Sequence, residues 1–144
     1  MTISPSPQYL HEIEHSGLAQ GAGHWSEKDY VDELASTQSK VFYLPPPEEG
    51  FVLYRFVAGD IEIMNLAVRQ KGRGHGKLLL ESFLALPLLQ GSVQKVFLEV
   101  AASNGAARKL YSRVGFRESG LRQAYYRNGE DAVTCVLEVS NENN

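Results

Sequence analysis

Residues 61–100 read IEIMNLAVRQKGRGHGKLLLESFLALPLLQGSVQKVFLEV. The segment contains a strand-like run at 61–68, a basic glycine-rich loop at 69–77, a helical pattern of apolar residues from 79 to 86, and a β-prone run at 95–100. Parallel strands need a long crossover, usually a helix, and such crossovers are right-handed in nearly all proteins. The segment therefore predicts a parallel strand–helix–strand unit.

The residues on both sides of this unit extend it into a larger sheet. Further strands are predicted at 41–44, 51–57, 116–126 and 132–139. The first two would form an antiparallel meander with 61–68, and the last two a terminal hairpin. Helices are expected near Pro7, after Ser26 and over 104–114, with Gly115 at the left-handed stop position. We therefore predict an α/β fold with a mixed central sheet flanked by helices.

The composition fits a single soluble domain. The 144 residues leave too little chain for two domains, and 43% of them are hydrophobic. With 14 Lys+Arg against 17 Asp+Glu, the net charge of −3 argues against a protein that coats nucleic acid. No apolar run approaches the ~20 residues of a membrane span, and the first five residues do not resemble a signal peptide. We expect one cytoplasmic domain over 1–144, with a disordered tail at 140–144.

Cysteine and histidine usage gives little support to a metal site. Cys135 is the only cysteine, which excludes an internal disulfide and a four-thiolate zinc site. It lies in an alternating strand pattern, where a small core residue is expected. The segment from His11 to His15 satisfies the H-E-x-x-H pattern of zinc proteases. However, its helix is short, terminal and poorly apolar, so we expect a solvated helix face and no metal.

The loop at 69–77 concentrates glycine and positive charge. Glycines let the backbone approach a ligand closely, and free N–H groups at a helix start favour phosphate oxygens. Leu78 stands where a Walker A loop needs Ser or Thr, and Lys77 stands where a dinucleotide fingerprint needs glycine. We expect a phosphate-binding loop of another type; a solvated basic turn is the alternative. The cations of the loop are Arg69, Lys71, Arg73 and Lys77.

Three polar residues follow the start of the second parallel strand. Glu99 lies near the carboxyl end of that strand, where open α/β sheets place their ligands, although an outward-facing edge residue is an equal alternative. Asn104 is most simply the N-cap of the next helix. Tyr111, taken alone, is most simply a core aromatic residue whose hydroxyl finds a partner.

Taken in order, these features resemble the GCN5-related N-acetyltransferase (GNAT) family. The similarity runs from Trp25 to about Val139. Within the family, it is strongest to the members that acetylate the N-terminal alanine of a small-subunit ribosomal protein. The motifs that carry it are Asn65-Leu66-Ala67-Val68, Gly74-His75-Gly76-Lys77, Leu98-Glu99-Val100, Ala102-Ser103-Asn104, the run from Leu110 to Phe116, Arg122 with Tyr125-Tyr126, and Glu130-Asp131-Ala132.

The resemblance implies that acetyl-CoA binds in a cleft between two splayed parallel strands. The pantetheine arm would pair with the backbone of Leu66, Ala67 and Val68, and Asn104 would contact the cofactor. The family's pyrophosphate-binding loop motif aligns with this sequence on Gly74 and Gly76. An alignment one step earlier, from Arg69 to Gly74, is the alternative. The residues expected to hold the pyrophosphate are Gly72, Arg73, Gly74, His75, Gly76 and Lys77.

The resemblance also implies direct acetyl transfer with Glu99 as general base and Tyr111 as general acid. An α-amine has a pKa of about 7.7–8.0, so at neutral pH much of it must lose a proton before it attacks. Trp25, Tyr125 and Tyr126 would line the groove for the acceptor.

The acceptor implied is the N-terminal peptide of a ribosomal protein, with no contact to nucleic acid or membrane. Ala101 stands where the ribosomal-protein enzymes commonly carry arginine, so a charge near the peptide is missing. A lysine side chain or a small amine is the alternative acceptor. A non-catalytic acetyl-CoA-binding module is the alternative function. The oligomeric state is open, and a monomer fits the sequence.

Overall fold

The computed structural model of the protein describes residues 5–16, 25–86, 91 and 93–139, and the tail expected at 140–144 lies outside them. Four helices and six strands occupy this part of the chain. The helices are α1 (Pro7–Ser16), α2 (Glu27–Leu34), α3 (His75–Leu84) and α4 (Gly105–Val114). The strands are β1 (Ser39–Leu44), β2 (Gly50–Val57), β3 (Asp60–Val68), β4 (Lys95–Ala101), β5 (Arg117–Arg122) and β6 (Ala132–Glu138).

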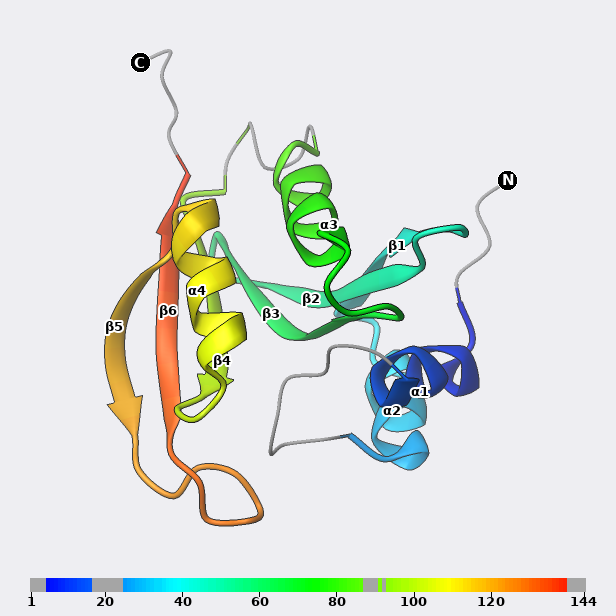
Figure 1. Ribbon diagram of the computed structural model, residues 1–144, viewed down its shortest axis with the longest axis horizontal. Helices are drawn as coiled ribbons and strands as arrows, with labels where there is room; N and C mark the ends of the chain where they lie inside the picture. The colour runs from blue at the N-terminus through cyan, green and yellow to red at the C-terminus, as the bar shows by residue number, and fades with distance from the viewer. Residues whose placement is uncertain (1–4, 17–24, 87–90, 92, 140–144) are drawn as a thin grey trace.

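The strands form one mixed sheet in the order β1-β2-β3-β4-β6-β5 (Figure 1). The meander β1–β2–β3, the parallel β3–β4 pair and the β5–β6 hairpin are all confirmed. The predicted extent of the hairpin's first strand was wrong, because β5 ends at Arg122 rather than at 126. Ala124 adopts a positive φ of 49°, and its backbone N–H donates to Asp131 Oδ1 at 2.8 Å, so the chain turns away from the sheet there.

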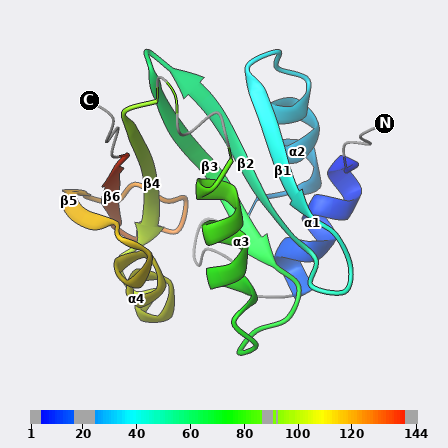
Figure 2. The same cartoon turned by 90° about the horizontal axis from the view of Figure 1, so that it is seen from above.

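The two central strands are parallel over a short stretch and then separate. Only Ile61 with Val96 and Glu62 with Phe97 are paired between β3 and β4 in the described residues. Figure 2 shows the strands diverging toward the ends at which α3 and α4 begin. The register between β2 and β3 shifts at Met64, which marks a β-bulge, and bulges bend and twist a strand locally. The predicted splayed sheet is therefore present.

Helices cover both faces of the sheet. On one face, α3 and α4 pack over a core that includes Phe83 and Tyr111. On the other, which we call the α1–α2 face, the helices pack over a smaller core that includes Ile13 and Phe51. Leu98 of β4 belongs to the α3–α4 core, and successive residues of a strand point to opposite faces, so the neighbouring Glu99 points to the α1–α2 face.

Local signals in the sequence explain how several elements begin and end. Ser26 and Asp29 form a capping box at the start of α2, in which each side chain accepts a backbone N–H of the other residue. Asn104 caps α4 by accepting the Ala107 N–H at 3.2 Å, which confirms its predicted capping role. Gly115 ends α4 with a φ of 117°. Cys135 is a buried free thiol of the core, as predicted.

No helix within the described residues is long and apolar enough to cross a bilayer.

Candidate active site

A cleft of about 710 Å³ opens on the sheet where β3 and β4 separate. Its walls come from α2, from the central strands, from α4 and from the loop that joins β5 to β6. Ligand pockets in proteins commonly have volumes of about 300–1,000 Å³. The predicted site residues that the cleft brings together are Trp25, Leu66, Glu99, Tyr111, Tyr125 and Tyr126.

Glu99 reaches the cleft from β4 and is held by a cation. Its Oε2 lies 2.6 Å from Nε of Arg122, and the Glu99 side chain is 20% exposed. Arg122 is itself 59% exposed at the sheet edge, and its guanidinium lies over the Tyr125 ring, 5.5 Å from the centroid. The carboxylate is therefore accessible from the cleft, and its counter-ion is a side chain that solvent can reach.

Tyr111 lies at the inner wall of the same cleft. It is 1% exposed, belongs to the α3–α4 core and packs at 6.0 Å, centroid to centroid, against Phe116. Tyr111 therefore belongs to the hydrophobic core and also lines the cleft. A tyrosine so placed can present its hydroxyl to a ligand while the ring is held by packing.

The aromatic residues expected in the acceptor groove come from two separate segments. Trp25 precedes α2, and Tyr125 and Tyr126 lie in the loop after β5. Burial raises the pKa of both tyrosines, and the nearby charge of Glu99 raises it further. At neutral pH both hydroxyls therefore stay protonated and can donate hydrogen bonds.

The loop after β5 is linked to α2 across the cleft. Nη2 of Arg127 lies 3.3 Å from Oδ1 of Asp29, which belongs to the first turn of α2. The backbone N–H of Ser26 lowers the pKa of Asp29, and Arg127 lowers it further despite partial desolvation. This ion pair joins the two segments that carry the aromatic residues.

A second ion pair braces α2 against the sheet. Nε and Nη2 of Arg55 contact the two carboxylate oxygens of Glu33 at 2.6 and 2.7 Å. Burial on its own would raise the pKa of Glu33, but the hydrogen bonds from Arg55 and Ser39 outweigh it and hold the pKa below its usual value. Both charges of this pair are therefore engaged with each other at neutral pH.

The glycine-rich loop lies between the end of β3 and the start of α3. Gly72 and Gly74 have left-handed φ angles of 72° and 78°, and Gly74 is the N-cap of α3 without a side-chain hydrogen bond. The N–H groups of the first turn therefore have no side-chain cap. Nδ1 of His75 is buried without a hydrogen-bond partner among the described residues. Both features suit an anionic ligand such as a phosphate.

Gly76 has a second function, in packing. A Cβ added at this position would lie 3.0 Å from Cδ2 of Leu110, a residue of α4. The absence of a side chain therefore lets α3 approach α4 closely. This packing role accounts for the glycine independently of any ligand.

Replacing Gly74 by alanine is expected to lower the free energy of unfolding by about 1 kcal/mol, because left-handed backbone costs an L-residue roughly that much. The added Cβ meets nothing within 4 Å, so the loss of stability would come from backbone strain alone. Gly105→Ala is the matched control. It also has open space, lies in the first turn of α4 without a positive φ, and is expected to be neutral or stabilising. Equal urea midpoints for the two variants would contradict this interpretation.

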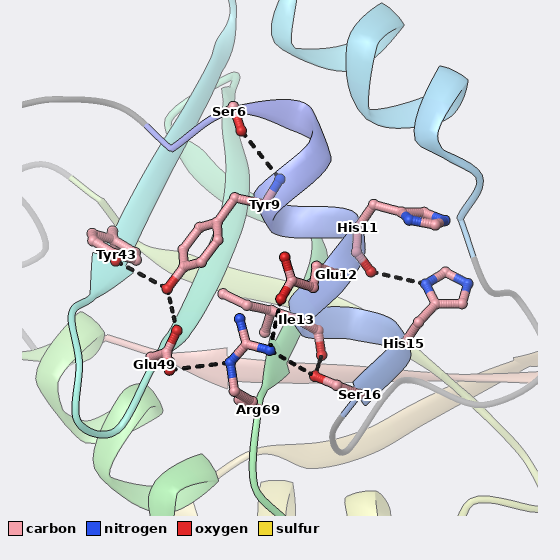
Figure 3. Close-up of polar contacts among 10 residues, drawn as sticks. All are labelled: Ser6, Tyr9, His11, Glu12, Ile13, His15, Ser16, Tyr43, Glu49 and Arg69. Carbon is pink, nitrogen blue, oxygen red and sulfur yellow. Dashed lines mark hydrogen bonds and ion pairs between the residues drawn. The ribbon is translucent and has the colours of Figure 1, made fainter.

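The side chain of Arg69 points away from the basic loop and contacts α1 and the residue that precedes β2 (Figure 3). Its guanidinium pairs with Glu12 and with Glu49, each at 3.1 Å, and lies 5.7 Å from the centroid of the Tyr9 ring. Hydrogen-bonding capacity used in this way is not available to a phosphate.

The same contacts bear on the H-E-x-x-H pattern of α1. Glu12, the base in the zinc-protease interpretation, is paired with Arg69, and Nδ1 of His15 lies 2.9 Å from the carbonyl oxygen of His11. Across 5–16, 25–86, 91 and 93–139, no three His, Cys, Asp or Glu side chains are grouped so that they could hold a metal ion. The pattern on α1 gives no structural support to a metal centre.

A buried polar network, which was not predicted, lies behind the cleft. Glu14 is 1% exposed and accepts hydrogen bonds from the Tyr30 hydroxyl at 2.5 Å and from the Trp25 backbone N–H at 3.1 Å. Nδ2 of Asn65 donates to the Tyr30 hydroxyl at 2.9 Å, and Oδ1 of Asn65 accepts the Leu66 N–H at 2.9 Å. The network joins α1 and α2 to the bulged part of β3. It also occupies the Leu66 N–H, one of the backbone groups expected to meet pantetheine.

Comparison with known proteins gives a consistent result. Residues 11–116 match the profile of the Acetyltransferase (GNAT) family. The [Ribosomal protein bS18]-alanine N-acetyltransferase of Salmonella typhimurium is 36% identical over 122 residues, which are 81% of this chain and 82% of that protein. The uncharacterized N-acetyltransferase MJ1530 of Methanocaldococcus jannaschii is 33% identical over 94 residues, 64% of this chain and 60% of that protein.

A solved structure agrees with the sequence matches. The crystal structure of the ribosomal-protein-S18-alanine N-acetyltransferase from Escherichia coli superposes with a TM-score of 0.76 at 30% identity, covering 93% of this chain and 88% of that one. The family profile matches well over half of the chain, and the fold of the solved relative is the one described above. The chain therefore belongs to the GNAT family and is an acetyl-CoA-dependent N-acetyltransferase.

Proposed function

We propose that this enzyme acetylates the N-terminal α-amine of a protein, most specifically the N-terminal alanine of a small-subunit ribosomal protein. The observation that carries the proposal is one cleft that holds both Glu99 and Tyr111 together with three aromatic side chains. The similarity of the chain to the bS18-alanine acetyltransferases supports the choice of acceptor. A ribosomal acceptor would place the reaction in the cytoplasm.

In the proposed reaction, Glu99 removes a proton from the acceptor's ammonium group. The freed amine attacks the thioester carbonyl of acetyl-CoA, so that a C–N bond forms and the C–S bond breaks. Tyr111 donates its proton to the departing thiolate, and the second proton that the nitrogen loses as it becomes an amide nitrogen returns to the Tyr111 oxygen, so no covalent enzyme intermediate is needed. Arg122, which neutralises Glu99 in the free protein, is exposed enough to move aside as the acceptor's positive charge arrives.

Several groups would hold acetyl-CoA in this proposal. Pantetheine would lie in the gap between β3 and β4 and pair with the backbone of Leu66, Ala67 and Val68, apart from the Leu66 N–H, which already donates to Asn65. The segment 72–77 would bind the pyrophosphate through N–H groups that have no side-chain cap, and Nδ1 of His75, which has no hydrogen-bond partner in the described part of the chain, would add a contact. Asn104 would contact the cofactor from the start of α4. The left-handed glycines and the buried ring nitrogen are the features that fit this ligand.

The test uses two peptides and acetyl-CoA. The first has a free N-terminal alanine and no lysine; the second has a blocked α-amine and an internal lysine. We expect a mass gain of one acetyl group on the first peptide only. Acetylation of the second peptide alone would point to a lysine-directed enzyme. Acetyl-CoA binding without transfer to either peptide would point to a small-amine acceptor or a binding module.

A further inference from the structure

A cluster of polar contacts, which we call the Arg69 cluster, lies where β3 ends and the glycine-rich loop begins (Figure 3). It consists of Tyr9, Glu12 and Ser16 of α1, Glu49 directly before β2, and Arg69 directly after β3. Nη1 of Arg69 donates to Oε2 of Glu12 at 3.1 Å and to the hydroxyl oxygen of Ser16 at 3.4 Å. Nε of Arg69 lies 3.1 Å from Oε2 of Glu49. One guanidinium therefore joins α1 and the start of β2 to the end of β3.

Glu49 is the centre of this cluster. Its Oε1 accepts the hydroxyl hydrogen of Tyr9, while its Oε2 faces the guanidinium of Arg69. Its carbonyl oxygen also accepts the backbone N–H of Arg69 at 3.0 Å. The side chains of Glu49 and Arg69 are only 19% and 23% exposed, and ion pairs shielded in this way are weakened less by salt than pairs on the open surface. Arg69 is thus held through its backbone and its side chain.

The α1 helix is a firm support for the cluster. Leu10 and Ile13 are fully buried in the core of the α1–α2 face, and Glu14 accepts the Tyr30 hydroxyl at 2.5 Å. The residues that meet Arg69 occupy the neighbouring stripe of the helix, at positions 9, 12 and 16. A shift of α1 relative to the sheet would disrupt both sets of contacts. Arg69 is therefore attached to an element whose place is fixed by packing.

The loop that follows Arg69 has little support of its own. In the described part of the chain, no ion pair or side-chain hydrogen bond engages any residue from 70 to 77. The far end of this segment is held by α3, where Gly76 lies against α4. At the near end, the β2–β3 ladder stops at the pair Gly50–Val68, and Arg69 continues the attachment by one residue. The position of the loop's start thus depends on Arg69.

We propose that Arg69 is a positioning residue for the cofactor. Held by Glu49 and α1, it fixes the start of the loop so that the N–H groups of 72–77 are already arranged for the pyrophosphate of acetyl-CoA. Groups arranged in advance bind more tightly, because less conformational freedom is lost on binding. The inference rests on the proposed contact between this segment and the pyrophosphate. Arg69 acts through the backbone, and its guanidinium stays with the two carboxylates.

Glu49→Gln separates this role from a simple effect of charge. Removing a negative charge beside an anion-binding loop reduces repulsion, so electrostatics alone predicts tighter binding of acetyl-CoA. Arg69 as a direct phosphate ligand predicts the same sign, because the substitution would release its guanidinium. The positioning role predicts the opposite. We expect the Kd of acetyl-CoA to rise about tenfold in calorimetric titrations, which corresponds to ordering roughly one more backbone residue on binding.

A donor without phosphates locates the defect in the loop. S-acetylpantetheine has the thioester and the pantetheine arm of acetyl-CoA but no pyrophosphate. With the alanine peptide as acceptor, Glu49→Gln should raise KM for acetyl-CoA about tenfold and keep kcat, while kcat/KM for S-acetylpantetheine stays at the wild-type value. General destabilisation would lower activity with both donors. Arg69→Lys should show the same contrast, since one ammonium group lacks the planar fork that meets both carboxylates.

Glu48→Gln is the matched control. It removes the same charge from the neighbouring residue, which has no ion pair or side-chain hydrogen bond among the described residues, and it should not weaken the binding of acetyl-CoA. Unchanged or tighter binding by Glu49→Gln, or an equal loss with both donors, overturns the positioning role. Wild-type protein that binds acetyl-CoA no better than S-acetylpantetheine overturns the pyrophosphate contact. The titrations need no acceptor, so failure to acetylate the alanine peptide overturns the proposed acceptor alone.

Discussion

Replacing Glu99 by glutamine is expected to lower kcat by about 100- to 1,000-fold at neutral pH, which is the usual contribution of a positioned general base. Glutamine has the shape of glutamate and can still accept a hydrogen bond from Arg122, but it cannot take up the acceptor's proton. The glycine-rich loop is untouched, so the dissociation constant of acetyl-CoA should stay within about twofold. Steady-state kinetics with the Ala peptide, together with calorimetric titration of acetyl-CoA, measure the two effects separately.

The control for this variant is Glu118→Gln. Glu118 is also held by an arginine, with Arg108 Nε at 2.8 Å, but it lies on the edge strand β5 outside the cleft. Its rate should match that of the wild type. The defect of Glu99→Gln should shrink as the pH rises past about 8, because the acceptor amine then loses its proton unaided. Wild-type turnover by Glu99→Gln at neutral pH would show that another group is the base.

Replacing Tyr30 by phenylalanine is expected to lower the free energy of unfolding by about 2–4 kcal/mol. The change removes one hydroxyl and with it two buried hydrogen bonds, the one that Tyr30 donates to Oε1 of Glu14 and the one that it accepts from Nδ2 of Asn65. A buried polar atom that loses its hydrogen bond costs about 1–3 kcal/mol. Because domains are stable by only about 5–15 kcal/mol, the loss should be plain in a urea titration monitored by circular dichroism.

Tyr43→Phe is the comparison for this effect. The Tyr43 hydroxyl is partly buried and donates one hydrogen bond, to the Tyr9 hydroxyl at 3.2 Å. Its loss should cost only about 0.5–1.5 kcal/mol, the usual net value of one hydrogen bond. If the two variants lost the same stability, Glu14 and Asn65 would have found new partners, and the network would not be the rigid link described above.

The central part of the fold was predictable because its signals are local. The change from a strand pattern to a helical one around the glycine-rich loop specifies the crossover between β3 and β4. The alternation around Leu98 and Glu99 gives the face on which the carboxylate lies. Asn104 and Gly115 mark the limits of α4 through capping chemistry that involves only neighbouring residues.

What could not be predicted depends on partners far apart in the chain. Glu14 occupies a polar helix pattern that looks solvated, and its burial follows from meeting Tyr30, 16 residues later. Arg69 looks like a phosphate ligand, yet Glu12 and Glu49 engage it. Arg122 belonged to a motif without an assigned role, and only the β5–β6 pairing brings it to Glu99.

The short β3–β4 contact has a thermodynamic consequence. Among the residues that the structure describes, two residue pairs join the β1–β2–β3 half of the sheet to the β4–β6–β5 half, and much of the inner edge of each half has no neighbouring strand there. A ligand bound along both edges would couple the halves and bind only the folded chain. At a concentration 100 times its dissociation constant, such a ligand adds about 2.7 kcal/mol to the unfolding free energy. The stability of this protein would then be a function of how much acetyl-CoA surrounds it.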